Sequence, residues 1–221
     1  SDIALSHTIA REIIVNGQPR QAPRSRSARL RTAKKIQMVF QDPYSSLDPR
    51  QTGFACLDET LRVHTGLSAP QRREAVEGLG DQVSLGQKEL NSTPRRLSGG
   101  QRQRLAIARA LAVEPSVLVL DEAVSALDVS VQAQILNLLV DLRRARGLSY
   151  VFVSHDLAVV RQISDDVIVM RSGTVVERGA TADVLGNPQA AYTRLLRESV
   201  PRRGWKPRRS LGRSGPSDAS P

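Results

Sequence analysis

The chain has 221 residues, of which 40% are hydrophobic and only 3% aromatic, so it is long enough for one domain with an aliphatic core. No apolar run reaches the roughly 18 residues that mark a membrane-spanning helix, and the first residues lack the charged-then-apolar order of a signal peptide. The single cysteine, Cys56, excludes an internal disulfide bond and suits a reducing compartment.

The formal net charge of +10 is concentrated in two segments. Arg20–Lys35 carries seven basic residues and no acid, and Pro201–Pro221 has a net charge of +5. Between them, Ile36–Val200 has 18 basic and 19 acidic residues, so the body of the chain is nearly neutral. A nucleic-acid-binding protein is expected to carry basic residues on its folded body, so this distribution argues against that class. The composition of Pro201–Pro221 predicts a disordered tail.

The beginning of the chain shows weak patterns. Glu12–Val15 predicts a strand, and Asn16-Gly17 is a turn dipeptide. The polar, basic segment Gln18–Lys35 predicts a mobile, solvated loop, with a nucleic-acid contact as the alternative. Ile36–Phe40 is then a short apolar strand that ends at Gln41.

Helices are expected over Thr52–Arg96. Pro70 suits the first turn of a helix that Ser68 or Ala69 would cap. We expect Gly78, Gly80 and Gly86 to interrupt this helix.

The most informative stretch is Leu97–Asp128. It opens with Leu-Ser-Gly-Gly-Gln, and an amphipathic helix with Leu105, Ala108, Leu111 and Ala112 on its core face follows. Small residues at a helix start let a ligand approach the backbone, and the unpaired N–H groups there favour an anion such as phosphate. An ordinary capped helix is the alternative explanation for these residues taken alone.

After a break at Pro115, the apolar run Val117–Leu120 predicts a strand buried on both faces, and it leads into Asp121-Glu122. Ligands of parallel sheets bind at the carboxyl ends of strands, so the two acids are candidate site residues. Tyr150–Val153 predicts another buried strand, and His155 follows it as either a site residue or a satisfied loop histidine.

The remaining elements are predicted from caps and periodicity. Ser130 would cap a helix that runs to Arg146 and ends before Gly147, and Asp156 would cap a helix that runs to Ile163. Further elements are a hairpin of Asp166–Met170 with Thr174–Glu177 about Ser172-Gly173, and a terminal helix over Asn187–Leu196.

Taken in order, these motifs resemble the ATP-binding cassette (ABC) ATPases. In that family LSGGQ at Leu97–Gln101 is the signature, LVLDE at Leu118–Glu122 the Walker B strand, and SALD at Ser125–Asp128 the D-loop. The segment Gln41–Arg50 resembles the Q-loop of oligopeptide, dipeptide and nickel importers in particular. The resemblance implies an α/β fold, an incomplete P-loop NTPase (ABC cassette) with a parallel sheet core and a helical subdomain. It implies a partial cassette over residues 1–200, a helical subdomain over about 52–96 and a basic tail over 201–221.

The resemblance also implies site residues and cofactors. Glu122 would polarise the attacking water, His155 would contact the γ-phosphate, and Gln41 would reach both the water and Mg²⁺. Asp121 would hold Mg²⁺, usually through water. The remaining implied residues are the D-loop Asp128 and the signature Ser98, Gly99, Gly100 and Gln101, which would bind the nucleotide of a partner chain. ATP and Mg²⁺ are the implied cofactors.

The phosphate loop G-x-x-x-x-G-K-[ST] does not occur in these 221 residues. We therefore expect the chain alone to bind ATP weakly or not at all. A homodimer would have two signature faces and no phosphate loop, so a heterodimer with a complete cassette is favoured. Two explanations stay open, a truncated cassette and a degenerate subunit.

The expected function is an ATP-binding and ATP-hydrolysing subunit of an importer of peptide-class solutes, at the cytoplasmic face of the cell membrane. Its partners would be a second cassette and membrane-spanning permease subunits, and no nucleic acid is expected. One alternative is a non-transport ABC protein that contacts nucleic acid through its basic loop and tail. Another is a non-catalytic partner subunit.

Overall fold

The computed structural model describes residues 14–15, 17–19, 25, 28, 30 and 34–199. These residues group into two compact units, which divide between Ser164 and Asp165. Each unit is described by itself below. The predicted boundary of a partial cassette at residue 200 and the predicted tail at 201–221 lie outside the described residues.

A parallel three-stranded sheet forms the centre of the first unit. Its strands are β3 (Ile36–Val39), β4 (Val117–Asp121) and β5 (Ser149–Val153), in the order β3-β4-β5. Val39 pairs with Leu120, which in turn pairs with Phe152. The prediction of a parallel α/β core is confirmed by this sheet, and all three strands lie where the apolar runs predicted them.

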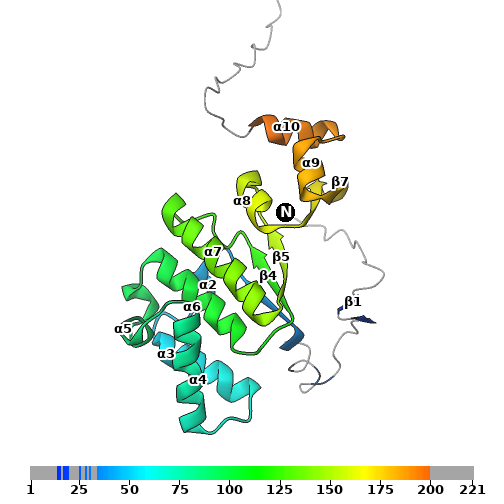
Figure 1. Cartoon of the computed structure of the whole chain (residues 1–221). Coiled ribbons are helices and arrows are strands. Elements are labelled where there is room, and N and C mark those ends of the chain that lie inside the picture. Colours follow the sequence, from blue (N-terminus) through cyan, green and yellow to red (C-terminus); the bar gives the residue numbers. More distant parts are fainter. Residues whose placement is uncertain are drawn as a thin grey trace, which may run out of the picture. The chain divides into compact units, whose positions relative to one another are not determined.

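Helix α6 contacts β3 and also contacts α3 and α4. In Figure 1, α3, α4 and α5 gather on the side of α6 away from the strands. Leu57, Leu105, Ile107 and Leu111 are fully buried in the resulting core. The helices are α2 (Pro43–Ser46), α3 (Gly53–His64), α4 (Ala69–Gln82), α5 (Gln87–Leu90), the 3₁₀ helix η1 (Pro94–Arg96), α6 (Gly99–Leu111), α7 (Val129–Arg146) and α8 (Leu157–Ile163).

The predicted interruption of the second helix was wrong, because α4 continues through Gly78 and Gly80. At Gly80 a Cβ would lie 2.8 Å from the Leu85 carbonyl oxygen and from Leu90 Cδ1, so the glycine permits close packing rather than ending the helix. Gly86 does lie at a boundary, as the residue that precedes α5. Of the two caps that the sequence allowed, Ser68 and Ala69, the structure has Ser68, whose amide donates to Gln71 Oε1 at 2.9 Å.

Two further local predictions were wrong. Gln18–Pro19 form β2, which pairs with β1 (Ile14–Val15) about Gly17, whereas a loop was expected there. The cap of α7 is Asp128 and not Ser130, because Asp128 Oδ1 accepts the Val131 amide at 2.9 Å. The end of α7 agrees with the prediction, with Gly147 in the left-handed region at φ 65°.

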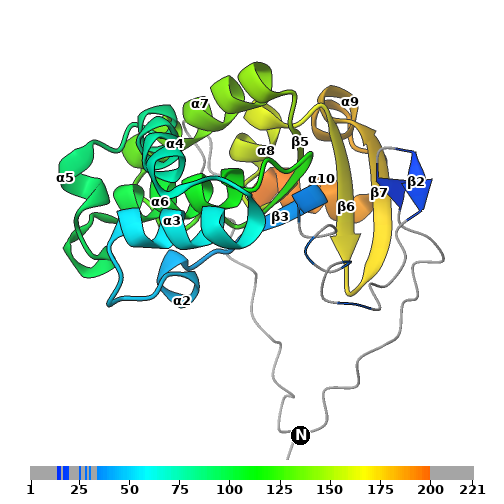
Figure 2. The same cartoon turned by 90° about the horizontal axis from the view of Figure 1, so that it is seen from below.

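The second unit contains the hairpin that the sequence predicted. Strands β6 (Asp166–Arg171) and β7 (Thr174–Ala180) are antiparallel, as Figure 2 shows, and Ser172 and Gly173 both have positive φ in the turn. Helix α9 (Thr181–Gly186), which was not predicted, packs on β7, and α10 (Ala191–Ser199) follows. No helix of the described residues is long and apolar enough to cross a membrane.

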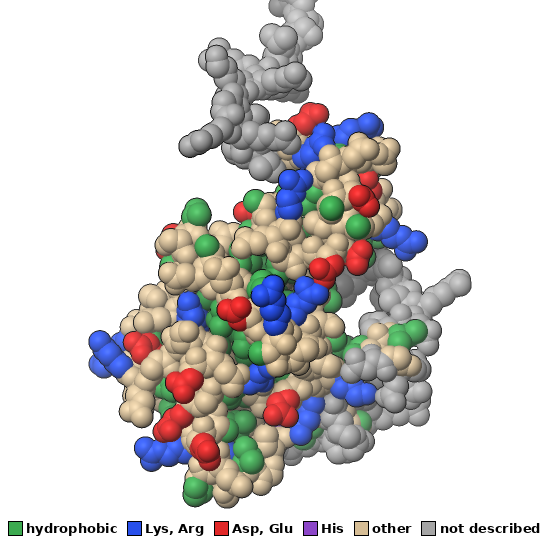
Figure 3. Space-filling model, in the orientation of Figure 1, with side chains coloured by type: hydrophobic (Ala, Val, Ile, Leu, Met, Phe, Trp, Pro, Cys, Tyr) green, Lys and Arg blue, Asp and Glu red, His purple; other side chains and the backbone are tan. Residues whose placement is uncertain are grey.

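Charges are mixed on the face that Figure 3 shows, with basic and acidic side chains interspersed over the described surface. This distribution agrees with the nearly neutral body that the sequence indicates.

Candidate active site

Three strands of the parallel sheet deliver polar residues to one edge. Because β3, β4 and β5 run in the same direction, their carboxyl ends meet at that edge. Gln41 follows β3, Asp121 and Glu122 end and follow β4, and His155 follows β5. The sequence-predicted residues are therefore brought to the edge at which ligands of open α/β sheets bind.

Glu122 and His155 are in direct contact, although they lie far apart in the sequence. His155 Nδ1 is 3.1 Å from Glu122 Oε1. The His155 side chain is 73% exposed and that of Glu122 is 28% exposed, so the pair faces solvent. This arrangement places a carboxylate acceptor and an imidazole side by side, where a water and a phosphate could reach both.

The backbone of Glu122 is held in an uncommon conformation. Its φ is 45°, in the left-handed region that glutamate rarely adopts. The Glu122 amide donates to the Val153 carbonyl oxygen at 3.0 Å, and the Glu122 carbonyl oxygen accepts the Ser125 amide at 3.0 Å. Such backbone strain is concentrated at functional sites, and here two hydrogen bonds stabilise it.

Gln41 is not part of this contact. It is exposed after β3, and it makes no hydrogen bond to Glu122 or His155 in the described part of the chain. Instead it lines a neighbouring pocket with Asp42 and Gly99.

The predicted signature residues begin α6. The Ser98 amide donates to Gln101 Oε1 at 2.8 Å, and Ser98 Oγ accepts the Gln101 amide at 3.3 Å. This capping box fixes the helix start. The amides of Gly99 and Gly100 lie in the first helical turn, which leaves them available to an anion.

Gly100 also has a packing role. A Cβ there would overlap Val131 Cγ1 of α7, so glycine lets α6 and α7 approach each other. At Gly99 a Cβ would lie 3.3 Å from Leu127 Cδ2, which is a less severe contact. The two glycines thus differ in how much substitution they tolerate.

Asp128 accepts hydrogen bonds at the start of α7. Its Oδ1 accepts the Val131 amide at 2.9 Å and the Ser130 hydroxyl at 2.7 Å. These hydrogen bonds, that of Val131 first, lower the pKa of the Asp128 carboxyl. Asp128 is therefore fixed as an anionic cap.

A magnesium site would depend mainly on the nucleotide. No group of three or more His, Cys, Asp or Glu side chains gathers as a metal site in the described residues. Asp121, at the end of β4, can supply one oxygen ligand, and Mg²⁺ ordinarily completes its shell with phosphate oxygens and water. The residues present fit that mode of binding.

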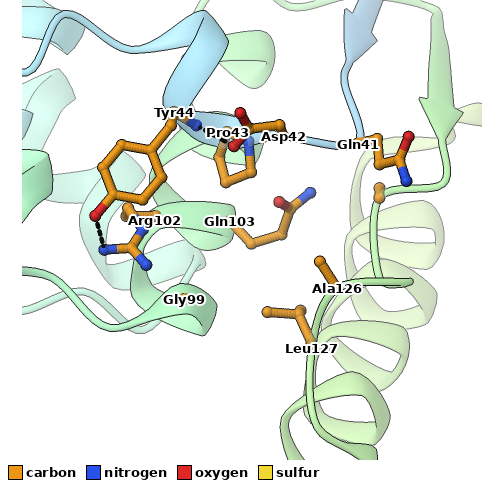
Figure 4. Close-up of a pocket in the computed structure, with 10 residues that line it drawn as sticks. Gln41, Asp42, Pro43, Tyr44, Gly99, Arg102, Gln103, Ala126 and Leu127 are labelled. Atoms are coloured by element: carbon orange, nitrogen blue, oxygen red, sulfur yellow. Dashed lines mark hydrogen bonds between the residues drawn. The ribbon is translucent and has the colours of Figure 1, made fainter.

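The sequence analysis did not identify Arg102 and Tyr44 as partners. Arg102 Nη1 donates to the Tyr44 hydroxyl at 2.7 Å and to the Leu97 carbonyl oxygen at 2.6 Å (Figure 4). The guanidinium carbon also lies 4.1 Å from the centroid of the Tyr44 ring. The available signal was an arginine directly after the signature and a tyrosine after Gln41, but no spacing rule joins residues so far apart.

Comparison with known proteins identifies the family. The family model described as "ABC transporter" matches residues 4–125. The dipeptide transport ATP-binding protein DppF of Haemophilus influenzae is 52% identical over 169 residues, which cover 76% of this chain and 52% of the relative. The glutathione import ATP-binding protein GsiA of Shigella flexneri serotype 5b is 50% identical over 191 residues, which cover 86% of this chain and 30% of the relative. The chain thus spans about half the length, or less, of these curated relatives.

Solved structures agree with the sequence relatives. The structure of cbiO1 from Clostridium perfringens, part of the ABC transporter complex cbiONQ, matches with a TM-score of 0.71 and 28% identity, over 80% of this chain and 68% of that one. The ATP-binding cassette MJ0796, a dimer bound to ADP and Pi, matches with a TM-score of 0.67 and 28% identity, over 77% of this chain and 73% of that one. The parallel sheet, the ordered motifs and these relatives lead to one conclusion: the chain belongs to the ABC transporter family.

Proposed function

We propose that this chain is an ATP-binding and ATP-hydrolysing subunit that energises an importer of peptide-class solutes. The observation that carries the proposal is the contact between Glu122 and His155 at the carboxyl edge of the sheet, 3.1 Å between Oε1 and Nδ1. The substrate class is suggested by relatives named for dipeptide transport and glutathione import.

In this proposal Glu122 accepts a proton from the attacking water as the water bonds to the γ-phosphorus of ATP. The bond from phosphorus to the β,γ-bridging oxygen then breaks, which yields ADP and phosphate. His155 contacts the γ-phosphate, and its position beside Glu122 keeps the water and the phosphate within reach of both groups. Bound Mg²⁺ would neutralise phosphate charge, with Asp121 and Gln41 on its side of the site.

The start of α6 would act on a nucleotide held by another cassette. Ser98, Gly99, Gly100 and Gln101 lie at or beside the first turn of a 13-residue helix, whose N-terminus favours phosphate. Because the phosphate loop is not found in these 221 residues, we propose that the chain alone binds ATP poorly. A heterodimer with a cassette that carries this loop would complete one site, between that loop and the signature of this chain. Glu122 would face the other half-site, so hydrolysis through Glu122 requires a phosphate loop that these 221 residues do not contain.

The remaining partners follow from the same assignment. Permease subunits would dock on the helical segment that includes α3, α4 and α5, and the assembly would lie at the cytoplasmic face of the membrane. A non-catalytic subunit that only lends its signature to a partner is the second candidate, because the start of α6 would suffice for that role.

The test is ATP hydrolysis by a complete ABC cassette mixed with this chain. We expect stimulation by the wild-type chain and none by Ser98→Arg, because a long cation at the helix start would block the phosphate position. Glu74→Arg is the matched control, since it adds the same side chain at an exposed position of α4. Equal stimulation by the Ser98→Arg and wild-type chains would contradict the proposal.

Glu122→Gln then separates the two candidates. An ATP-hydrolysing subunit should lose roughly 10²–10⁴-fold in turnover when its general base is neutralised. A subunit that lends only its signature should lose much less.

A further inference from the structure

Arg102 of α6 joins two segments that lie far apart in the sequence. Its Nη1 donates to the Tyr44 hydroxyl at 2.7 Å and to the Leu97 carbonyl oxygen at 2.6 Å, with a longer contact of 3.3 Å to the Pro94 carbonyl oxygen. Figure 4 shows the Tyr44 hydroxyl pointing at this guanidinium. Arg102 Nε has no hydrogen-bond partner among the described residues, so these bonds all depend on Nη1. Tyr44 and Leu97 are therefore linked through a single nitrogen.

The Leu97 carbonyl belongs to the peptide unit that leads into the signature. This carbonyl and the Ser98 amide lie in one planar group, which can turn only as a whole. Arg102 Nη1 donates to the oxygen of this group at 2.6 Å, and Gln101 Oε1 accepts its N–H at 2.8 Å. The peptide unit ahead of Ser98 is thus held at both ends, and Arg102 supplies one of the two contacts.

Tyr44 is in turn fixed by the segment that carries it. It lies in α2, the one-turn helix after β3, and its amide donates to Asp42 Oδ1 at 2.9 Å. On its other side, the Ser46 carbonyl oxygen accepts a hydrogen bond from Arg109 Nη1, which also belongs to α6. The Tyr44 ring centroid lies 4.1 Å from the guanidinium carbon of Arg102, a distance at which a ring face attracts a cation. Tyr44 therefore offers Arg102 an acceptor in a fixed place.

We infer that Arg102 is a positioning residue for the signature, and that Tyr44 keeps Arg102 in place. Through the Leu97 carbonyl, Arg102 sets the orientation of the peptide that precedes Ser98, and with it the direction of the Ser98 hydroxyl. Arg102 contacts no nucleotide in this role. The consequence for hydrolysis rests on the proposed function, in which the signature acts on a nucleotide held by another cassette. The orientation of the peptide does not rest on that function.

The first experiment follows the ¹H–¹⁵N signal of the Ser98 backbone amide in the full 221-residue chain. Tyr44→Phe removes the hydroxyl and keeps the ring, so Arg102 loses one of its two short hydrogen bonds and the Ser98 signal should shift. Tyr192→Phe is the matched control, because Tyr192 also lies beside an arginine, with the Arg171 guanidinium carbon 4.9 Å from its ring centroid. This control should leave the Ser98 signal in place.

Arg102→Met then tests whether the effect passes through Arg102, because methionine keeps an unbranched side chain but cannot donate a hydrogen bond. In the Arg102→Met chain, adding Tyr44→Phe should not shift the Ser98 signal further, as expected of residues that act through a shared contact. The inference is overturned by a Ser98 signal that Tyr44→Phe does not shift, or by an equal shift with and without Arg102. The single variant Tyr44→Phe keeps the inference falsifiable even where Arg102→Met does not fold.

The second experiment measures ATP hydrolysis by a complete ABC cassette mixed with increasing amounts of this chain. Tyr44→Phe should lower the maximal stimulation roughly two- to tenfold, the effect of one hydrogen bond, at an unchanged half-saturating concentration of the chain. A merely structural role would raise that concentration instead, because less folded chain would be present. That result, or an unchanged maximum, would contradict the role of Arg102 in the reaction. If the wild-type chain gives no stimulation, the proposed function fails, and the Ser98 shifts alone decide the inference.

Discussion

Strands β4 and β5 are both short apolar runs that candidate site residues end or follow, yet the two strands differ in how exposed their side chains are. In β4, Leu118 and Leu120 are fully buried, and the strand has a partner on each side. In β5, Val151 is 51% and Val153 46% exposed, and the described sheet pairs it with β4 alone.

The sequence analysis expected both strands to be buried. In β4 this is correct for Leu118 and Leu120, whereas Val117 and Val119 are only partly buried. In β5 the expectation was wrong, because Tyr150 and Phe152 are partly buried and the other residues are exposed.

The difference shows what an apolar run does and does not predict. Val, Leu, Tyr and Phe in succession predict a strand, because such side chains suit a pleated surface. They do not predict which neighbours cover that strand, because this depends on elements distant in the sequence. Tyr150 and Phe152 are the residues of β5 that pack against the core, and the Tyr150 hydroxyl also donates to the Leu139 carbonyl oxygen at 2.8 Å.

The largest expected effect is the difference in the free energy of unfolding between an alanine substitution at a buried residue of β4 and one at an exposed residue of β5. Leu120→Ala should lower the free energy of unfolding by about 2–5 kcal/mol, because it leaves a cavity in the core. Val151→Ala should change it by less than about 0.5 kcal/mol. Urea denaturation of both variants measures the contrast. Similar losses for the two would mean that β5 is covered as well as β4.

The next effect concerns the contact between α6, which precedes β4, and α7, which follows it. Gly100→Ala should cost about 1–3 kcal/mol, because the added methyl group overlaps Val131 Cγ1. Gly78→Ala is the matched control. Nothing lies within 4 Å of its added Cβ, so this change in α4 should stabilise the protein by about 0.5–1 kcal/mol. A Gly100→Ala variant as stable as the wild type would refute the close approach of α6 and α7.

A smaller effect tests the hydrogen bond that Tyr150 of β5 makes with the Leu139 carbonyl oxygen. Tyr150→Phe should cost about 0.5–1.5 kcal/mol, the usual value of a hydrogen bond. Burial raises the pKa of Tyr150 to about 12, above its ordinary value of 10.0. Because the neutral phenol is favoured in the folded protein, this contribution is present below pH 10 and is lost between about pH 10 and 12. Melts in that range should decline more steeply for the wild type than for Tyr150→Phe, and parallel declines would contradict the burial.

The smallest expected effect on stability is that of a substitution at Asp128, which caps α7, the helix after β4. Asp128→Ala should lower the melting temperature by a few degrees at most at pH 7. Hydrogen bonds lower the pKa of this carboxyl, so its stabilisation is present above the ordinary pKa and is lost as the pH falls through the lower folded value. The gap between wild type and variant should therefore narrow from pH 7 to pH 2. A gap that stays constant would mean that the charge of Asp128 does not contribute.

Much of the fold was predictable from local chemistry. The helix starts at Ser68, Ser98 and Asp156, the strands β3, β4 and β5, and the turn at Gly173 all agree with the sequence patterns. Each depends on a residue and its near neighbours. The misplaced cap at Ser130 shows the limit, since Asp128 and Ser130 are both good caps and only the backbone geometry decides between them.

The sequence predicted the individual residues of the candidate site, but it did not predict the contacts between their side chains. Glu122 and His155 were each chosen from their places after strands, and the parallel sheet then brings them to 3.1 Å. The contact of Arg102 with Tyr44 and the unpaired amide of Gln103 depend on side-chain positions that no periodicity encodes. The roles proposed for all the site residues stay predictions, namely those of Glu122, His155, Gln41, Asp121, Asp128 and the signature residues.

The most direct test of the account is equilibrium binding of Mg-ATP to the isolated chain, with a thermal melt on the same sample. The account predicts a cooperative melt that millimolar Mg-ATP does not shift, because the chain folds but does not carry the phosphate loop. A micromolar dissociation constant, with the higher melting temperature that tight binding to the folded state produces, would contradict it. That result would mean that these residues form a complete phosphate site of their own.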